Sequence, residues 1–338
     1  MTRKLVIATA MLLFAAACSA AVPATVPAPP PPQALMESAA DSGGDEIQLV
    51  AMSRARYVLL GIDCFGPLGE ATCQELESLS GLQVGKSIPL GWNGGGAASR
   101  MRSKGGWDHV SLSPVFYPDG SAWLAIDVRN GPSPVRSEPT GRVALRSNLV
   151  QVYAAFHGAY VELSRSGVRV PREASDGSWN YLHRALAPYV ALFQTEVPLY
   201  RTSLTRMLLT DGRATHRRAA AGLLGFDLEH PDTVSALSAA LLDPDATVRT
   251  GAATALLPKV REATLRGELV LEVGDVVQML MLPSHSDRAG ASALLMEMSR
   301  LPQARRDIRT EARPILEQMA AGSHPVTREL AQKLLATR

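Results

Sequence analysis

Three cysteines are the side chains of this sequence that form covalent bonds most readily. Cys18 lies in the N-terminal segment considered below, which leaves Cys64 and Cys73 as an even pair. In an oxidising compartment such a pair predicts a disulfide. Closing so short a loop would stabilise the fold by about 2–3 kcal/mol. The alternative is that Cys64 and Cys73 are two small buried thiols.

Two glycine-containing segments have some features of nucleotide sites, and neither fits. Gly81–Ser87 (GLQVGKS) has one residue fewer between its glycines than a P-loop needs to wrap phosphates with successive backbone N–H groups. Ser80 occupies the position of the missing glycine. Gly43–Glu46 (GGDE) resembles a diguanylate cyclase signature but lies at the end of a linker. No nucleotide or other cofactor is therefore predicted.

The sequence also lacks the common catalytic and metal-binding motifs. It has no Gly-x-Ser-x-Gly elbow, His-Glu-x-x-His helix, Cys-x-x-Cys pair or calcium loop. The histidines are scattered singly, and we interpret His157 as a surface or helix-capping residue. No catalytic, cofactor-binding or metal-binding residue is predicted, and we expect the protein not to be an enzyme.

The length and composition favour two folded units with additional segments. The chain has 338 residues, of which 46% are hydrophobic and 20% charged. Its 34 basic and 32 acidic residues leave a formal net charge of +2. This near balance predicts no nucleic-acid partner.

Residues 1–18 have the pattern of an export signal. Arg3 and Lys4 precede the apolar run Leu5–Ala17, which is too short for a bilayer core that needs about 20 helical residues. Ala15–Cys18 resembles a bacterial lipobox, although Ala15 stands where Leu is commonest. The resemblance implies lipidation of Cys18 and a lipid anchor in the bacterial envelope. Cleavage near Ala20, Ala21 or Ala24 would instead release a secreted protein.

Residues 19–49 are predicted to be a disordered, proline-rich tether. Pro29–Pro32 favours extended polyproline II, and the small and polar residues of Ser38–Gly44 favour a flexible joint. Such a spacer would hold a folded domain away from a membrane.

Residues 50–133 have the pattern of a small α/β unit. Tyr57–Cys64 predicts a strand with Val58, Leu60 and Ile62 on one side. Glu70–Ser80 predicts a helix that Gly81 ends. The turn Pro118–Gly120 predicts a hairpin of strands His109–Tyr117 and Ser121–Arg129.

This order of elements resembles a POTRA domain, a module of outer-membrane assembly and secretion proteins. The matching segments are Phe65-Gly66, Leu79–Gly85, Gly106–Val110 and Val128–Pro132. The resemblance implies a β-α-β-β unit that binds polypeptides through a sheet edge. The glycine-rich segment Gly91–Gly96 departs from the family and predicts a short second helix, Ala97–Lys104.

After a turn-rich linker at residues 134–146, residues 147–338 have helical periodicity. Apolar stripes predict a helix over 149–163 and another over 180–193, which Pro188 should bend. From Thr215 onward, Arg217, Arg249, Arg288 and Arg328 recur at intervals of about 32 to 40 residues, a period typical of paired-helix solenoids. The predicted repeat core follows each arginine: Ala220, Leu223, Leu224, Ala252, Leu256, Ala291, Leu294, Leu295, Ala331 and Leu334.

Leu242–Arg249 (LDPDATVR) and His216–Gly225 resemble bacterial HEAT-like repeats. The resemblance implies an all-α solenoid of three to five repeats, with aspartates that cap helices in the turns. The predicted fold class is therefore α+β, a POTRA-like domain followed by a HEAT-like solenoid.

Together these features predict a non-catalytic lipoprotein of the cell envelope that binds another envelope protein through its repeats. A small-molecule substrate is not expected. The alternative is an envelope hydrolase or lyase with a site at the junction of the two domains, around Trp92–Trp107.

Overall fold

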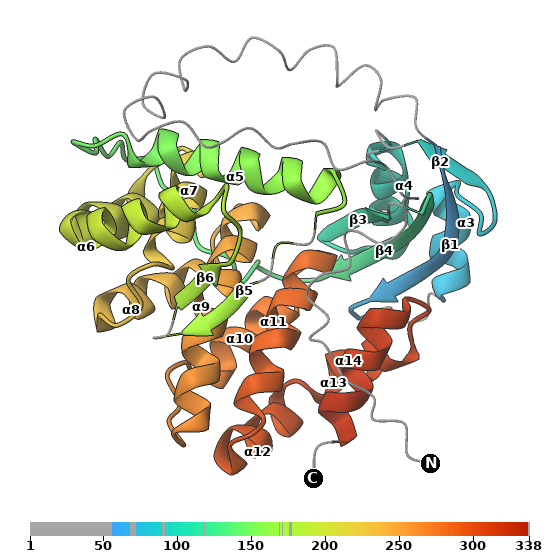
Figure 1. Cartoon of the computed structure of the whole chain (residues 1–338). Coiled ribbons are helices and arrows are strands. Elements are labelled where there is room, and N and C mark those ends of the chain that lie inside the picture. The colour runs from blue at the N-terminus through green and yellow to red at the C-terminus, as the bar shows by residue number, and fades with distance from the viewer. Residues whose placement is uncertain are drawn as a thin grey trace, which may run out of the picture.

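The computed structural model of the protein describes residues 56–336 apart from 68–71, 90–91, 93, 118, 169, 171 and 176–177. The predicted signal, Cys18 and the tether lie outside the described residues. The described chain forms a small mixed sheet unit followed by a large helical array, which confirms the α+β class (Figure 1).

The sheet has four strands in the order β2-β1-β4-β3, with β1 parallel to β4 and the other pairs antiparallel. The hairpin agrees with the prediction, whereas the short strand β2 was not predicted. The strands are β1 (Arg56–Phe65), β2 (Ser87–Pro89), β3 (His109–Phe116) and β4 (Ser121–Arg129).

The predicted apolar face of β1 is wrong, because the strand contains a bulge. Its register against β4 shifts between Leu59 and Gly61, so the alternation of side chains changes phase there. Leu59 is fully buried, whereas Val58 and Leu60 are 43% and 48% exposed. Ile62 lies beyond the bulge and packs against the core of the sheet unit.

Helices α3 (Cys73–Ser80) and α4 (Gly95–Gly105) accompany the sheet. The first begins three residues later than predicted, since Thr72 and Glu75 form a capping box at its start. The second is longer than predicted, because Gly94 adopts a positive φ of 64° that lets the helix begin within the glycine run. Leu76, Met101 and Trp107 of this region form a core with apolar residues of the strands.

The predicted helix over 180–193 is also wrong at its start. A two-stranded hairpin, β5 (Arg172–Ser175) and β6 (Ser178–Tyr181), precedes α6 (Ala187–Thr210). Pro188 therefore lies in the first turn of α6, where its missing N–H group costs nothing, and does not bend the helix.

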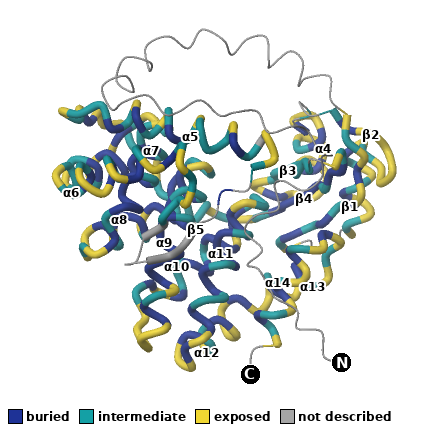
Figure 2. Tube along the Cα trace, in the orientation of Figure 1, coloured by how far each residue is buried: buried dark blue, intermediate teal, exposed yellow. Residues whose placement is uncertain are grey.

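The remaining helices stack and bury the alanines of the repeat frame, whereas the fourth arginine of the frame, Arg328, is exposed. Ala220, Ala252, Ala291 and Ala331 are all fully buried. Helix α9 (Ala246–Leu265) packs between α7 (Ala214–Leu224) and α11 (His285–Met298), and α11 packs against α14 (Pro325–Ala336) (Figure 2). The predicted core leucines are buried as well. The helices are α5 (Leu149–Arg165), α7 (Ala214–Leu224), α8 (Pro231–Ala240), α9 (Ala246–Leu265), α10 (Val273–Leu280), α11 (His285–Met298), α12 (Pro302–Glu311), α13 (Arg313–Ala321) and α14 (Pro325–Ala336).

The linker between the two units is packed along the array. Val143 is buried and donates its backbone N–H to Asp211. The backbone N–H of Arg136 donates to the carbonyl of Leu242. None of the helices in the described part of the chain combines the length and apolar character needed to cross a bilayer.

Candidate functional site

Buried arginine–aspartate pairs hold the helices of the array in register. Arg217 on α7 donates two hydrogen bonds to Asp243, at 2.9 and 3.0 Å. Arg249 on α9 makes the same pair with Asp287, at 2.9 and 2.6 Å. In both, Nη1 also donates to the carbonyl six residues earlier in the chain. Each arginine therefore ties its own helix to the preceding turn and to the next repeat.

The third arginine of this ladder reaches the sheet. Arg288 on α11 donates to both carboxylate oxygens of Asp127 on β4, at 2.5 and 3.1 Å, and its guanidinium stacks 3.9 Å from the Phe65 ring. Nη1 again donates to the carbonyl six residues earlier, that of Leu282. Asp127 thus occupies the place that an aspartate of a following repeat would take.

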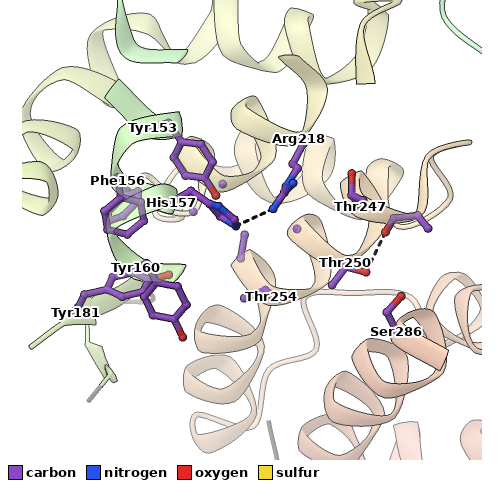
Figure 3. Close-up of a pocket in the computed structure, with 16 residues that line it drawn as sticks. Tyr153, Phe156, His157, Tyr160, Tyr181, Arg218, Thr247, Thr250, Thr254 and Ser286 are labelled. Atoms are coloured by element: carbon purple, nitrogen blue, oxygen red, sulfur yellow. Dashed lines mark hydrogen bonds between the residues drawn. The ribbon is translucent and has the colours of Figure 1, made fainter. Parts of the chain in front are cut away.

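A pocket of about 410 Å³ opens between α5, the hairpin strand β6 and helices α7, α9 and α11 (Figure 3). Aromatic rings form one side of it, and hydroxyl-bearing side chains form the other. The lining side chains include Tyr153, Phe156, His157, Tyr160, Tyr181, Arg218, Phe226, Thr247, Thr250, Thr254 and Ser286.

The aromatic side is a packed cluster. Phe156 contacts Tyr181 edge-to-face, with ring centroids 5.1 Å apart, and also contacts Phe226. Tyr153 lies against Gly222 of α7, where a Cβ atom would come within 1.9 Å of the tyrosine oxygen. Glycine at this position is therefore required for the tyrosine to reach the pocket.

A cation and a neutral histidine meet at the centre of the pocket. The Arg218 guanidinium donates to Nε2 of His157 at 2.7 Å. Burial lowers the pKa of His157, and the positive charge of Arg218 lowers it further, so the imidazole is neutral at pH 7. Among the described residues, no carboxylate lies within ion-pair distance of Arg218. The pocket therefore carries an uncompensated positive charge.

The hydroxyl side is a row on one face of α9. Thr247, Thr250 and Thr254 lie at helical spacing, with Ser286 from α11 beyond them. The hydroxyl of Thr250 donates to the carbonyl of Ala246 at 2.9 Å, which leaves oxygen lone pairs as acceptors. The pocket thus offers one cation, hydrogen-bond acceptors and aromatic surface, which is a set of groups for binding.

The predicted site residues lie elsewhere. The repeat-core alanines and leucines are buried between helices, where they position the pocket without lining it. Cys64 and Cys73 are joined in a disulfide in the sheet unit, with Cα atoms 5.6 Å apart. Cys18 lies outside the described residues.

The region proposed for an enzymatic site, Trp92–Trp107, is partly packed and partly open, because its two tryptophans lie in the core of the sheet unit whereas Arg102 lines a cavity at the junction of the two units. Trp107 is buried and donates Nε1–H to the carbonyl of Pro67 at 3.0 Å, and Trp92 packs against the same core. In the part of the chain that the structure describes, no group of three or more His, Cys, Asp or Glu side chains could hold a metal ion.

Sequence reasoning missed the pocket because its residues had other plausible roles. Tyr153, Phe156 and Tyr160 belong to the apolar stripe of α5, and His157 was interpreted as a surface or capping residue. The signal that could have identified the site is Arg218, which follows the buried Arg217 and lies on a different face of the same helix. Two adjacent arginines on one helix cannot both join the buried ladder.

A scan against protein-family models found no match, and neither did a search of curated proteins. Among solved structures, the chain is similar to a designed armadillo repeat protein. The sequence identity is 15% and the TM-score is 0.35, and the alignment covers 56% of this chain and 90% of the designed protein.

Proposed function

We propose that this protein is a non-catalytic scaffold of the bacterial cell envelope that binds another envelope protein in the Arg218 pocket. The observation that carries the proposal is a guanidinium that has no carboxylate partner among the described residues and lies in an aromatic pocket formed by stacked helices. Stacked helical repeats form extended surfaces of the kind that bind other polypeptides.

The lining of the pocket defines the partner segment. A carboxylate, from Asp, Glu or a chain terminus, would pair with Arg218. A neighbouring aromatic or apolar side chain would pack on Tyr160 and Tyr181, and backbone N–H groups would donate to the threonine hydroxyls. The expected partner is therefore an extended polypeptide segment with an acidic group beside an apolar residue.

The family assignments are part of the same proposal. We propose that the array is a HEAT-like solenoid, supported by the recurring Arg and Ala positions and the aspartate caps such as Asp245, which accepts from the N–H of Thr247 at 2.8 Å. We propose that the sheet unit is POTRA-like, supported by its element order.

The envelope location rests on the N-terminal segment and on the cysteine pair. Lipidation of Cys18, or secretion if Cys18 is not lipidated, would place the protein in an oxidising compartment, where the Cys64–Cys73 disulfide is stable. Radiolabelled palmitate should label the wild-type chain and not Cys18→Ser. Equal labelling of the two would contradict the lipid anchor.

The binding proposal is tested by photo-crosslinking of the full chain in the bacterial envelope. A photoreactive residue at Thr250, inside the pocket, should give a specific adduct with one protein. The same residue at Thr310 on α12 should not, although Thr310 makes the equivalent intrahelical hydrogen bond and is exposed.

The yield of the crosslinked adduct should also depend on the Arg218 guanidinium. Arg218→Gln should reduce it at least about tenfold, as expected for loss of a charge-assisted hydrogen bond worth about 1.5–3 kcal/mol. Arg306→Gln, at a side chain 80% exposed on α12, serves as the matched control. An adduct that is insensitive to Arg218→Gln, or equal at both labelling sites, would overturn the proposal.

A further inference from the structure

A second cavity, of about 510 Å³, lies at the junction of the sheet unit and the helical array. It is bounded by the array-facing side of the β3–β4 hairpin, the turn after β1, the loop between α10 and α11, α13, and Arg102 of α4. The lining includes Arg102, His109, Arg129, Met281, Pro283 and Ile315.

Strand register explains why polar groups face this cavity. His109 pairs with Arg129, and Ser111 pairs with Asp127, so these four side chains point to one face of the sheet. The face is the one toward the array, because Asp127 bonds to Arg288 of α11. The opposite face carries the apolar side chains that pack on α3 and α4.

Contacts between residues that are far apart in the sequence hold the floor of the cavity in place. Gln318 on α13 accepts from the N–H of Gly66 at 2.9 Å and donates to its carbonyl at 3.2 Å. The hydroxyl of Ser113 donates to the carbonyl of Pro283 at 3.3 Å. These contacts between the two units therefore fix the shape of the cavity.

The cavity is cationic. Neither Arg102 nor Arg129 has a carboxylate within ion-pair distance among the described residues. Both oxygens of Asp127, the acidic side chain in the lining, are taken by Arg288. Asp108, close to Arg129, accepts from the backbone N–H of Gly131 at 2.7 Å.

Part of the hydrogen-bonding capacity of the Arg129 guanidinium is unused. Within the described chain, its Nε and Nη1 are shielded from solvent and have no hydrogen-bond partner. Burial lowers the pKa of Arg129, and Asp108 offsets this only in part. An anion in the cavity would give these N–H groups an acceptor after a rotation of the side chain, and would relieve the cost of leaving them unpaired.

The rest of the lining is apolar. Met281 is 49% exposed at the cavity, and Pro283, Pro314 and Ile315 line it as well. A volume of this size is in the range of small-molecule sites, which hold the ligand by apolar contact and orient it by a few polar groups.

We propose that the junction cavity binds an amphiphile with one anionic head group, carboxylate or phosphate, on an apolar chain. The head group lies at Arg129 and Arg102, and the chain lies along Met281, Pro283 and Ile315. This site is separate from the Arg218 pocket and does not depend on the function proposed for that pocket.

The test is calorimetric titration of the purified full chain with four ten-carbon probes: decanoate, decyl phosphate, decanol and decyltrimethylammonium. At least one of the two anions should bind saturably and at least about tenfold more tightly than decanol and the cation, a difference of about 1.4 kcal/mol. The tighter of the two anions identifies the head group.

Variants locate the site. Arg129→Gln and Arg102→Gln should each weaken binding of the anion about tenfold, and Ile315→Trp should abolish it by filling the cavity. Arg306→Gln, at an exposed side chain outside the cavity, should leave it unchanged. Thermal unfolding of each variant establishes that the fold is retained.

The proposal is overturned if no probe binds saturably, if decanol binds as tightly as both anions, or if the two cavity arginine variants bind like the wild type. If the full chain binds the anion but gives no crosslink at Thr250, the proposed function fails and the junction site stands. If the crosslink forms but no anion binds, the junction site fails and the proposed function stands.

Discussion

At the scale of single residues, the fold depends on charges that are buried and paired. Arg217 and Arg288 are among the largest fully buried side chains, and each has a carboxylate partner on a different element. A buried ion pair adds little stability over an apolar pair of similar volume, but leaving one partner alone is costly. The ladder therefore specifies which helix neighbours which.

Asp243→Ala should lower the free energy of unfolding by about 3–5 kcal/mol, because it leaves the buried Arg217 without its main partner. Urea denaturation measures the loss. Asp307→Ala, at the exposed Arg306–Asp307 pair, should cost less than about 1 kcal/mol. The double variant Arg217→Met/Asp243→Leu should recover most of the stability. Equal losses in the two single variants would contradict a structural role for the ladder.

Substitutions at two glycines distinguish the effect of close packing on stability from the effect of helix propensity. Gly222→Ala should destabilise the protein by about 1–3 kcal/mol, because the new Cβ would lie 2.2 Å from Cζ of Tyr153. Gly158→Ala, in α5 with nothing within 4 Å of the added atom, should stabilise it by about 0.5–1 kcal/mol. Chemical denaturation tests both, and a stabilising Gly222→Ala would show that Tyr153 does not lie against α7.

At the scale of elements, a covalent crosslink joins one strand and one helix of the sheet unit. The Cys64–Cys73 disulfide joins the end of β1 to the first residue of α3. The capping box at Thr72 fixes the start of the same helix. The register shift in β1 turns Asp63 and Phe65 toward the array while Leu59 remains in the core of the sheet unit.

Removal of the disulfide, as Cys64→Ala/Cys73→Ala, should cost about 2–3 kcal/mol. The effect should be local, so that hydrogen exchange speeds up in β1 and α3 and stays unchanged in α7 and α9. A reducing agent should change the exchange of the wild type and not that of the double variant. Uniform acceleration throughout the chain would contradict a local role for this crosslink.

At the scale of the whole molecule, the sheet unit terminates the helical array. Asp127 completes the arginine ladder at α11, and Asp63 on β1 accepts from the backbone N–H groups of Ser323 and His324 at the start of α14. The beginning and the end of the described chain therefore close on each other, as Figure 1 shows for β1, α13 and α14. A fragment containing the array alone would lack these partners.

Two histidines near the contact between the sheet unit and α14 make the free energy of unfolding depend on pH. His285 and His324 have ring centroids 4.6 Å apart, and His324 also contacts Tyr117, Thr327 and Asp63. Burial lowers the pKa of His285 to about 3, with further lowering by His324 and Arg288 against an opposing effect of Asp63. Burial also lowers the pKa of His324.

Above about pH 7 both histidines are neutral in the folded and the unfolded chain, so they add no pH dependence. As the pH falls from about 6.5 toward 3, the unfolded chain binds protons that the folded chain does not. The free energy of unfolding should therefore fall by about 2 kcal/mol by pH 5 because of His285, and His324 should lower it further. Urea denaturation at several pH values measures this slope. His285→Gln should flatten it, the exposed His109→Gln should not, and identical slopes in all three proteins would contradict the assignment.

The stacked helices could be predicted from the sequence because their signals are local. The spacing from each arginine to the alanine and leucines that follow it fits within two turns of one helix, and such a helix buries its apolar face only by stacking. The hairpin around Pro118–Gly120 is local in the same sense. Its turn residues and flanking alternation lie within one short segment.

Features that depend on residues far apart in the sequence were decided by tertiary contacts. Asp127 joins Arg288 across 161 residues, and neither position has a sequence pattern that selects the other. The Arg218 pocket needs α5, β6, α7, α9 and α11 together, and the junction cavity needs both units. Periodicity reports which face of an element is buried, but not which element covers it. Pairing, bulge position and cavities are consequences of long-range packing, and only the folded chain shows them.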